Sequence, residues 1–367
     1  MLLADASVRA LSDADRTALL FTTNMGLEDV VVTEFNERCA DAGHEVTATH
    51  EQPLDLNSYA LVESPAALDA LLPVAQQMRS VHHVLAPLYA FDVPETEPLD
   101  TIRAVLASVD VPAMTRAATF RVTSVRNGDH EFTSIDVQRA AGAGLQEQYA
   151  TAVDLEDFDL EVRVDVHDNR GLISIQHTQE ALSRRHLDGF QPRAALKANV
   201  AYALLRLAHV DAPDVLLDPF CGSATILLEA AAIWPDVRAH GNDWSEEVVK
   251  GARDNVARAN LGGRITIREG DVWHLSDTFD DVAADLIVTN PPFGVRIGRS
   301  MDFFPFYRRV LEQMAAVVRP GGRVVMLVLK QGPFNRALSD TGGFDVRHVR
   351  VIEMGGLYPR VFVLGTT

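Results

Sequence analysis

The sequence has little cysteine, little lysine and no long apolar run. Two cysteines in 367 residues, Cys39 and Cys221, exclude a disulfide framework and a cysteine-rich zinc site. The strongest apolar runs have the length of a strand, as at 324–329, whereas a membrane span needs about 20 residues. The first nine residues, MLLADASVR, carry an acid where a signal peptide would be basic. We therefore expect a soluble protein of the cytoplasm.

The excess negative charge is confined to the N-terminal part. The formal net charge of −18 arises from 51 acidic and 33 basic residues. Residues 1–175 contain 29 acidic and 11 basic residues, whereas residues 176–367 contain 22 of each. Such an excess of acid argues against nucleic-acid binding on net charge alone. It fits solvated surfaces in a halophilic or high-GC host, or a basic partner protein.

The C-terminal part has the pattern of a doubly wound, mostly parallel sheet. From about residue 214 onward, short apolar strands alternate with helices. The expected strands cover 215–218, 238–243, 265–269, 285–290 and 324–329, and the expected helices cover 224–233, 245–259 and 303–318. Near-continuous apolar strands of this kind are buried on both faces by the intervening helices. The N-terminal part mixes strands and helices, among them a strand at 119–125, a helix at 134–149 and strands at 160–166 and 171–176.

A strand, a tight turn and a helix start follow one another in LDPFCGSATI at 217–226. The turn contains one glycine, Gly222, rather than the three of a dinucleotide-binding loop, and it has no Walker lysine. Three acids, Asp218, Asp243 and Asp271, follow successive predicted strands, where a carboxylate can bind ribose hydroxyls. These features favour a cofactor with an adenosine and a carboxylate but no phosphates, namely S-adenosylmethionine. The alternatives are a dinucleotide site and a glycine turn that serves only packing.

A second motif, TNPPFG at 289–294, follows the fourth predicted strand of this sheet. Its two consecutive prolines stiffen the backbone and leave carbonyl groups without a competing amide donor. The side-chain carbonyl of Asn290 beside the Pro291 carbonyl forms a pair of acceptors suited to an exocyclic NH₂ group. Phe293 offers a flat face on which a base can stack. The alternative is a loop that is only stiffened by proline.

In combination these motifs resemble the THUMP-domain class I RNA guanine-N2-methyltransferases. NPPF resembles the catalytic tetrapeptide of enzymes that methylate amino nitrogens, and DPFCGSATILLEAA with NPPFGVRIG narrows the resemblance to this family. Similar stretches are TTNMGLEDVV at 22–31 for its N-terminal domain, FRVTSVRNGDHEF at 120–132 and VDLEDFDLEVRV at 153–164 for its THUMP domain, and GLYPRVF at 356–362 for its last strand. Asn290 favours the members that act on acceptor-stem guanines of tRNA over those with DPPY.

The resemblance implies an α/β protein in which ferredoxin-like and THUMP α+β domains precede a class I, Rossmann-like methyltransferase sheet. The boundaries that it suggests are 1–66 for the ferredoxin-like domain, 67–177 for the THUMP domain, 178–192 for a linker and 193–367 for the methyltransferase domain. It implies methyl transfer from S-adenosylmethionine to the N2 atom of a guanosine, with tRNA as the favoured RNA. Neither a metal nor a membrane is expected as a partner, and a monomer is favoured.

The resemblance also assigns roles to individual residues. It assigns catalysis to Asn290, Pro291 and Phe293. It assigns cofactor contacts to Asp218, Phe220, Gly222, Ala224, Thr225, Asp243, Trp244, Asp271, Val272 and Asn290. It assigns RNA contacts to Arg184, Arg185, Lys197, Arg296 and Arg299, for which the alternative is ordinary surface cations. Ala224 stands where the family usually has a second glycine, so we expect a methyl group near the methionine part of the cofactor.

Other functions fit parts of the sequence. Ribosomal RNA is the first alternative substrate. A DNA-adenine or protein-glutamine methyltransferase would share the NPP motif, but a THUMP-like half is not expected there. A non-catalytic RNA-binding assembly factor would be expected to have an eroded catalytic loop, whereas NPPF is intact at 290–293.

Overall fold

The computed structural model describes residues 7–11, 16–186, 188–192, 195–295 and 301–366. The chain divides into two compact units. The first unit comprises Met1–Thr22 and Val31–Ala181, and the second comprises Thr23–Val30 and Leu182–Thr367. A short N-terminal segment therefore groups with the C-terminal half. Within the described residues, no helix is long and apolar enough to cross a membrane.

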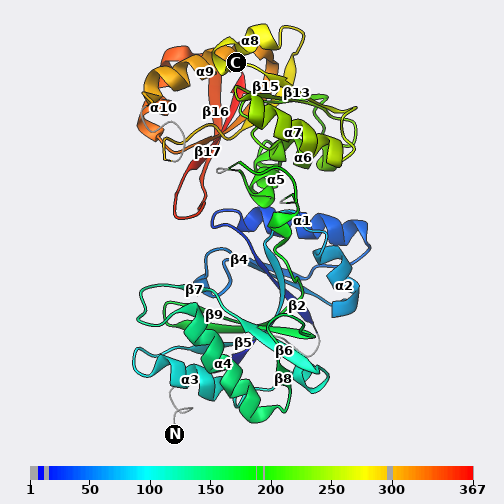
Figure 1. Ribbon diagram of the computed structural model, residues 1–367, viewed down its shortest axis with the longest axis vertical. Coiled ribbons are helices and arrows are strands. Elements are labelled where there is room, and N and C mark those ends of the chain that lie inside the picture. Colours follow the sequence, from blue (N-terminus) through cyan, green and yellow to red (C-terminus); the bar gives the residue numbers. More distant parts are fainter. Residues whose placement is uncertain (1–6, 12–15, 187, 193–194, 296–300, 367) are drawn as a thin grey trace. The chain divides into compact units, whose positions relative to one another are not determined.

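The first unit is built on a mixed sheet, which has ten strands among the described residues (Figure 1). In spatial order its main strands are β3 (Ala48–Glu51), β4 (Tyr59–Ser64), β2 (Thr17–Thr22), β5 (His83–Asp92), β10 (Arg170–Gln176), β9 (Leu160–His167), β6 (Thr119–Thr123) and β8 (Ala152–Val153). Two short strands lie off this path, β1 (Arg9–Ala10) beside β5 and β7 (Arg126–Asn127) beside β9. The helices are α1 (Glu28–Asp41), α2 (Leu68–Ala75), α3 (Pro98–Leu106) and α4 (Ser134–Gln148).

Helix α4 begins where its sequence predicts a helix start. The Thr133 hydroxyl accepts a hydrogen bond from the Asp136 amide, and the Asp136 carboxylate accepts one from the Thr133 amide at 2.8 Å. This reciprocal cap satisfies amide groups that the first turn leaves unpaired. Figure 1 shows α3 and α4 side by side, and both contribute to one apolar cluster with β6 and β9.

A buried polar network lies inside the first unit. The Asp165 carboxylate on β9 accepts hydrogen bonds from the Tyr59 hydroxyl at 2.7 Å, from Arg163 Nε at 2.7 Å and from the Val125 amide at 2.8 Å. Asp165 and Arg163 are 1% and 6% exposed. Each of these buried charges compensates the other, so removal of either partner would leave an uncompensated charge in the interior.

The second unit contains the doubly wound sheet that the sequence predicts. Its strands in spatial order are β13 (Ile265–Glu269), β12 (Arg238–Asp243), β11 (Val215–Asp218), β14 (Ala284–Thr289), β15 (Val318–Val328), β17 (Arg360–Thr366) and β16 (Phe344–Val351). The first five run parallel, whereas β17 is antiparallel to both of its neighbours. The helices are α5 (Ala198–Leu207), α6 (Thr225–Ile233), α7 (Glu246–Arg258), α8 (Leu275–Thr278), α9 (Phe303–Val317) and α10 (Gln331–Thr341).

Apolar clusters bury both faces of this sheet. Helices α5, α6 and α7 share one cluster with Leu286 and Val288 of β14, and α8, α9 and α10 share another with Ile287 of the same strand. Figure 1 draws these sets in green and in yellow to orange. Alternate residues of one strand thus enter opposite cores, which explains why its sequence is apolar without interruption.

The predicted fold class is confirmed, with differences in detail. The sequence pattern did not predict α5, α8 and α10, and β15 begins at Val318, whereas its strand was expected at 324–329.

Candidate active site

A pocket with a volume of about 940 Å³ lies at the carboxyl ends of the parallel strands in the second unit. Strand β11 has β12 on one side and β14 on the other, so the winding direction reverses there. Ligands of open α/β sheets bind at such a reversal. The acid that ends β11 and the asparagine that follows β14 both line this pocket.

Asp218 ends β11 and is 1% exposed. Its Oδ1 atom accepts hydrogen bonds from the Thr289 hydroxyl at 2.6 Å and from the Phe220 amide at 3.1 Å. Burial raises the pKa of this carboxyl from 3.8 to about 7, against the opposing effect of these two bonds. A cationic group placed nearby would stabilise the ionised form.

The turn after β11 brings backbone close to the pocket. Gly222 adopts a φ of +52°, and a Cβ atom there would meet nothing within 4 Å, so this side of the turn is open. Ala224 also lies in the left-handed region, with a φ of 68°, but its side chain belongs to the apolar core beneath the loop and does not line the pocket. The expected contact between the Ala224 methyl group and the cofactor therefore has no support in this geometry. Cys221 is buried and burial raises its thiol pKa, as expected of a structural residue rather than a nucleophile.

Two acids and two tryptophans that follow the ends of β12 and β13 also line the pocket, namely Asp243, Trp244, Asp271 and Trp273. Asp243 accepts hydrogen bonds from the Gly222 amide at 3.3 Å and from the Ser245 amide at 3.1 Å, and burial raises its pKa. Asp271 is exposed and accepts one from the Trp273 amide at 3.0 Å. Trp244 is 77% exposed, so its ring is free to cover a ligand.

Asn290 and Pro291 lie directly after β14, beside the Asp218 loop. The Asn290 Oδ1 atom is buried and finds no hydrogen-bond partner among the described residues. An unpaired buried acceptor costs about 1–3 kcal/mol, so such an atom points to a missing donor. Phe293 is half-buried and packs against the apolar cluster on one side of the sheet. The three predicted catalytic residues, Asn290, Pro291 and Phe293, thus all line the pocket.

The five cations predicted to contact RNA do not share one environment. Lys197 is exposed and lines the pocket, and Arg184 is exposed. Arg185 instead holds the fully buried Glu229 of α6 through Nε at 2.8 Å and Nη2 at 2.7 Å, which gives it a structural role. Arg296 and Arg299 lie outside the described residues.

The segment predicted as a linker groups with the second unit from Leu182 onward. The Phe190 amide donates to Asn255 Oδ1 at 2.8 Å, and Asn255 Nδ2 donates to the Phe190 carbonyl at 2.9 Å and to the Ser223 carbonyl at 3.0 Å. Asn255 therefore connects this segment with the turn after β11.

Several pocket residues were missed by reading the sequence. They come from segments distant in sequence and include Asn24, Leu196, Val200, Met354 and Leu357. Only two of these segments, TTNMG and GLYP, stood out in the sequence. They did so because they resemble a family, and no residue pattern in them predicts a binding site.

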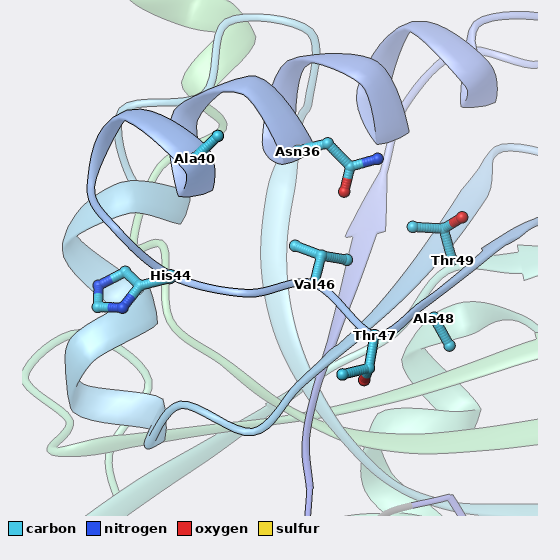
Figure 2. Close-up of a pocket in the computed structure, with 7 residues that line it drawn as sticks. All are labelled: Asn36, Ala40, His44, Val46, Thr47, Ala48 and Thr49. Carbon is cyan, nitrogen blue, oxygen red and sulfur yellow. The ribbon is translucent and has the colours of Figure 1, made fainter.

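A smaller hollow lies in the first unit between α1 and the segment that leads into β3 (Figure 2). It is lined by Asn36, Ala40, His44, Val46, Thr47, Ala48 and Thr49. No carboxylate, lysine or arginine lines it, so we assign it no chemistry. No group of residues suited to a metal ion occurs among the described residues.

Comparison with known proteins decides the family. The chain is 36% identical over 348 residues to the tRNA (guanine(6)-N2)-methyltransferase of Thermus thermophilus, covering 94% of this chain and 98% of that one. The chain belongs to the THUMP-domain RNA guanine-N2-methyltransferases. Residues 98–176 match the THUMP domain, and residues 185–360 match the RMKL-like methyltransferase domain.

Other members of this family agree. The mouse protein named tRNA (guanine(6)-N(2))-methyltransferase THUMP3 is 33% identical over 262 residues, which cover 68% of this chain and 51% of that one. The crystal structure of TrmN from Thermus thermophilus superposes with a TM-score of 0.75 at 33% identity, covering 96% of this chain and all of that one.

The methyl donor of a THUMP-domain guanine-N2-methyltransferase is S-adenosylmethionine, and the pocket fits it. Three carboxyl groups, Asp218, Asp243 and Asp271, suit a cationic cofactor without phosphates. The open side of Gly222 leaves room for close approach to the backbone.

Proposed function

We propose that this chain transfers a methyl group from S-adenosylmethionine to the exocyclic N2 atom of guanosine 6 in tRNA. The names of the relatives from Thermus thermophilus, mouse, cattle and human, which all specify guanine 6 of tRNA, support this substrate. The observation that carries the reaction is the buried Oδ1 atom of Asn290, beside Pro291 at the end of β14, which finds no hydrogen-bond partner in the described part of the chain.

Asn290 and Pro291 present two acceptors to an amine whose lone pair is delocalised into the guanine ring. Hydrogen bonds from this amine to Asn290 Oδ1 and to the Pro291 carbonyl draw its nitrogen toward tetrahedral geometry. They also stabilise the positive charge that develops during transfer. Because that charge exists only once transfer begins, the two acceptors lower the barrier more than they tighten binding. The proton leaves afterwards, so no strong base is required.

Phe293 completes this arrangement from the side of the base. Its half-buried ring offers a stacking face next to the two acceptors. A guanine within a stem must be flipped out of the helix to reach it, and stacking offsets part of the cost of unpairing.

S-adenosylmethionine supplies an electrophilic methyl group, and the chain provides its orientation relative to the amine. We assign the ribose to Asp243 and the adenine amine to Asp271, with backbone groups of Val272 beside it. Asp218 and Gly222 shape the end of the pocket nearest to Asn290. The hydrogen bonds that hold the first two carboxylates in place support these roles.

We assign different roles to the two units, RNA binding to the first and methyl transfer to the second. The THUMP match at 98–176 supports a role in RNA binding for the first unit, and we retain 1–66, 67–177, 178–192 and 193–367 as proposed domain boundaries. The N-terminal part is rich in acidic residues, so neutralisation of RNA phosphates can contribute little to binding. RNA binding must therefore depend on shape, on stacking and on a few well-placed cations. Arg184 and Lys197 are the described candidates for such cations. We place the protein in the cytoplasm as a monomer.

The test is methylation of tRNA transcripts in vitro, followed by position-resolved nucleoside mass spectrometry. We expect N2-methylguanosine at residue 6 and none in a transcript with adenosine 6. Methylation of ribosomal RNA fragments in preference, or of adenosine, would contradict the proposal.

A further inference from the structure

The turn between β16 and β17, residues 352–359, lies at the same edge of the sheet as Asn290. The first residue of β17, Arg360, pairs with Val328 at the carboxyl end of β15, and it pairs with Val351 at the end of β16. In the strand order this turn lies on the side of β14 opposite to β12 and β13, which carry the proposed cofactor acids. Three of its residues, Met354, Gly355 and Leu357, line the pocket.

The N-terminal segment Thr23–Val30, which groups with the second unit, holds this turn in place. Both backbone groups of Glu353 are bound by it: the amide donates to the Met25 carbonyl at 3.0 Å, and the carbonyl accepts from Asn24 Nδ2 at 2.8 Å. Asn24 Oδ1 accepts from Asn199 Nδ2 of α5 at 2.8 Å. Asn24 is 5% exposed and itself lines the pocket.

Further contacts join the same segment to the turn and to the end of β16. Gly26 has a φ of +87°, and a Cβ atom there would lie 2.2 Å from the Val351 carbonyl oxygen. Leu27 and Ile352 are fully buried in the same apolar cluster, and Arg350 Nη2 donates to Asp29 at 2.8 Å. Residues 351–353 are therefore fixed along their length, and the pocket residue Met354 directly follows them.

These contacts point to a part of the pocket that the cofactor residues leave open. Asn290 accepts the amine and Phe293 stacks on the base, so the rest of the base must extend beyond β14, away from the acids. The wall found there consists of two apolar side chains, Met354 and Leu357, and a glycine. A Cβ atom at Gly355 would meet nothing within 4 Å, so a planar ligand can approach its backbone.

On the basis of the proposed function, we propose that the turn 352–359 and the segment Thr23–Val30 form the subsite that receives the flipped guanine base. Met354 and Leu357 contact the base. Asn24 is a positioning residue that holds Glu353, and through it the turn, at the correct distance from Asn290. The chemistry at Asn290 thus depends on a residue more than 260 positions away.

The test compares Asn24→Ala and Met354→Ala in the full-length protein. Met354→Ala keeps every backbone hydrogen bond of the turn. It therefore tests the subsite even if Asn24→Ala fails to fold. Val346→Ala is the matched control, because Val346 is 49% exposed on β16 and does not line the pocket. Each variant is assayed for tRNA methylation, for affinity toward S-adenosylhomocysteine by calorimetry and for thermal unfolding.

We expect kcat/KM for tRNA to fall about tenfold or more in both pocket variants, the effect of losing one apolar contact or its support. The affinity for S-adenosylhomocysteine should stay within about twofold, and Val346→Ala should match the wild type. Unchanged kcat/KM in folded Met354→Ala, or a parallel loss of cofactor affinity, would overturn the subsite but leave the proposed function standing. A wild-type protein that methylates no guanosine would overturn both.

Discussion

Replacing Asn290 by alanine should lower activity without lowering stability. The Oδ1 atom is buried and unpaired among the described residues, so the folded protein gains nothing from it before substrate arrives. An unpaired buried acceptor costs about 1–3 kcal/mol, and its removal should leave the free energy of unfolding unchanged or raise it. During transfer the same atom accepts a hydrogen bond from an amine that becomes positively charged. Loss of one preorganised contact of this kind lowers turnover about 10²–10³-fold.

The assay is single-turnover methylation at saturating cofactor, with tRNA affinity measured separately and unfolding followed in urea. Asn290→Asp keeps an acceptor oxygen and adds negative charge, so it should retain more activity than Asn290→Ala while being less stable. Phe293→Ala serves as the contrast, because it should weaken the complex with the flipped base by about 1–3 kcal/mol of lost stacking. An unchanged single-turnover rate in Asn290→Ala, with weaker tRNA binding only, would refute the mechanism.

Three further outcomes follow from the contacts. Asp243→Ala should weaken S-adenosylmethionine binding by about 1–3 kcal/mol in calorimetry, and wild-type affinity would reject its ribose role. Asp218 keeps its proton in the folded state up to about pH 7 but loses it near pH 4 when unfolded. Stability should therefore fall as pH rises between these values, by at most about 4 kcal/mol, and Asp218→Asn should abolish this dependence in urea titrations. Asp165→Ala leaves the buried Arg163 without its counter-charge and should cost about 3–5 kcal/mol of unfolding free energy, whereas a loss below 1 kcal/mol would show that the network is dispensable.

The sequence predicted those parts of the site that depend on the succession of neighbouring elements along the chain. Asp218, Asp243 and Asn290 were located because a strand, a turn and a helix in succession place strand ends at one edge of a parallel sheet. The spacing of apolar residues predicted β11 to β14 and the helices α6 and α7 within about one residue. Local patterns of this kind carry over to three dimensions without knowledge of distant contacts.

The rest depends on contacts between distant segments. Nothing near Asn24 shows that it bonds Glu353 and Asn199, and nothing near Arg185 shows that it holds a buried glutamate. A fragment that begins at Thr178 would lack Thr23–Val30, whose Leu27 lies in the core of the second unit. We therefore expect such a fragment to be destabilised.

The central claim is that this chain methylates the N2 atom of guanosine 6 in tRNA through Asn290. Its most direct test is position-resolved mass spectrometry of tRNA from a strain that lacks the gene. We predict that N2-methylguanosine is lost at residue 6, restored by the wild-type gene and not restored by a gene carrying Asn290→Ala. Retention of the modification in the deletion strain, or full restoration by the variant, would contradict the account.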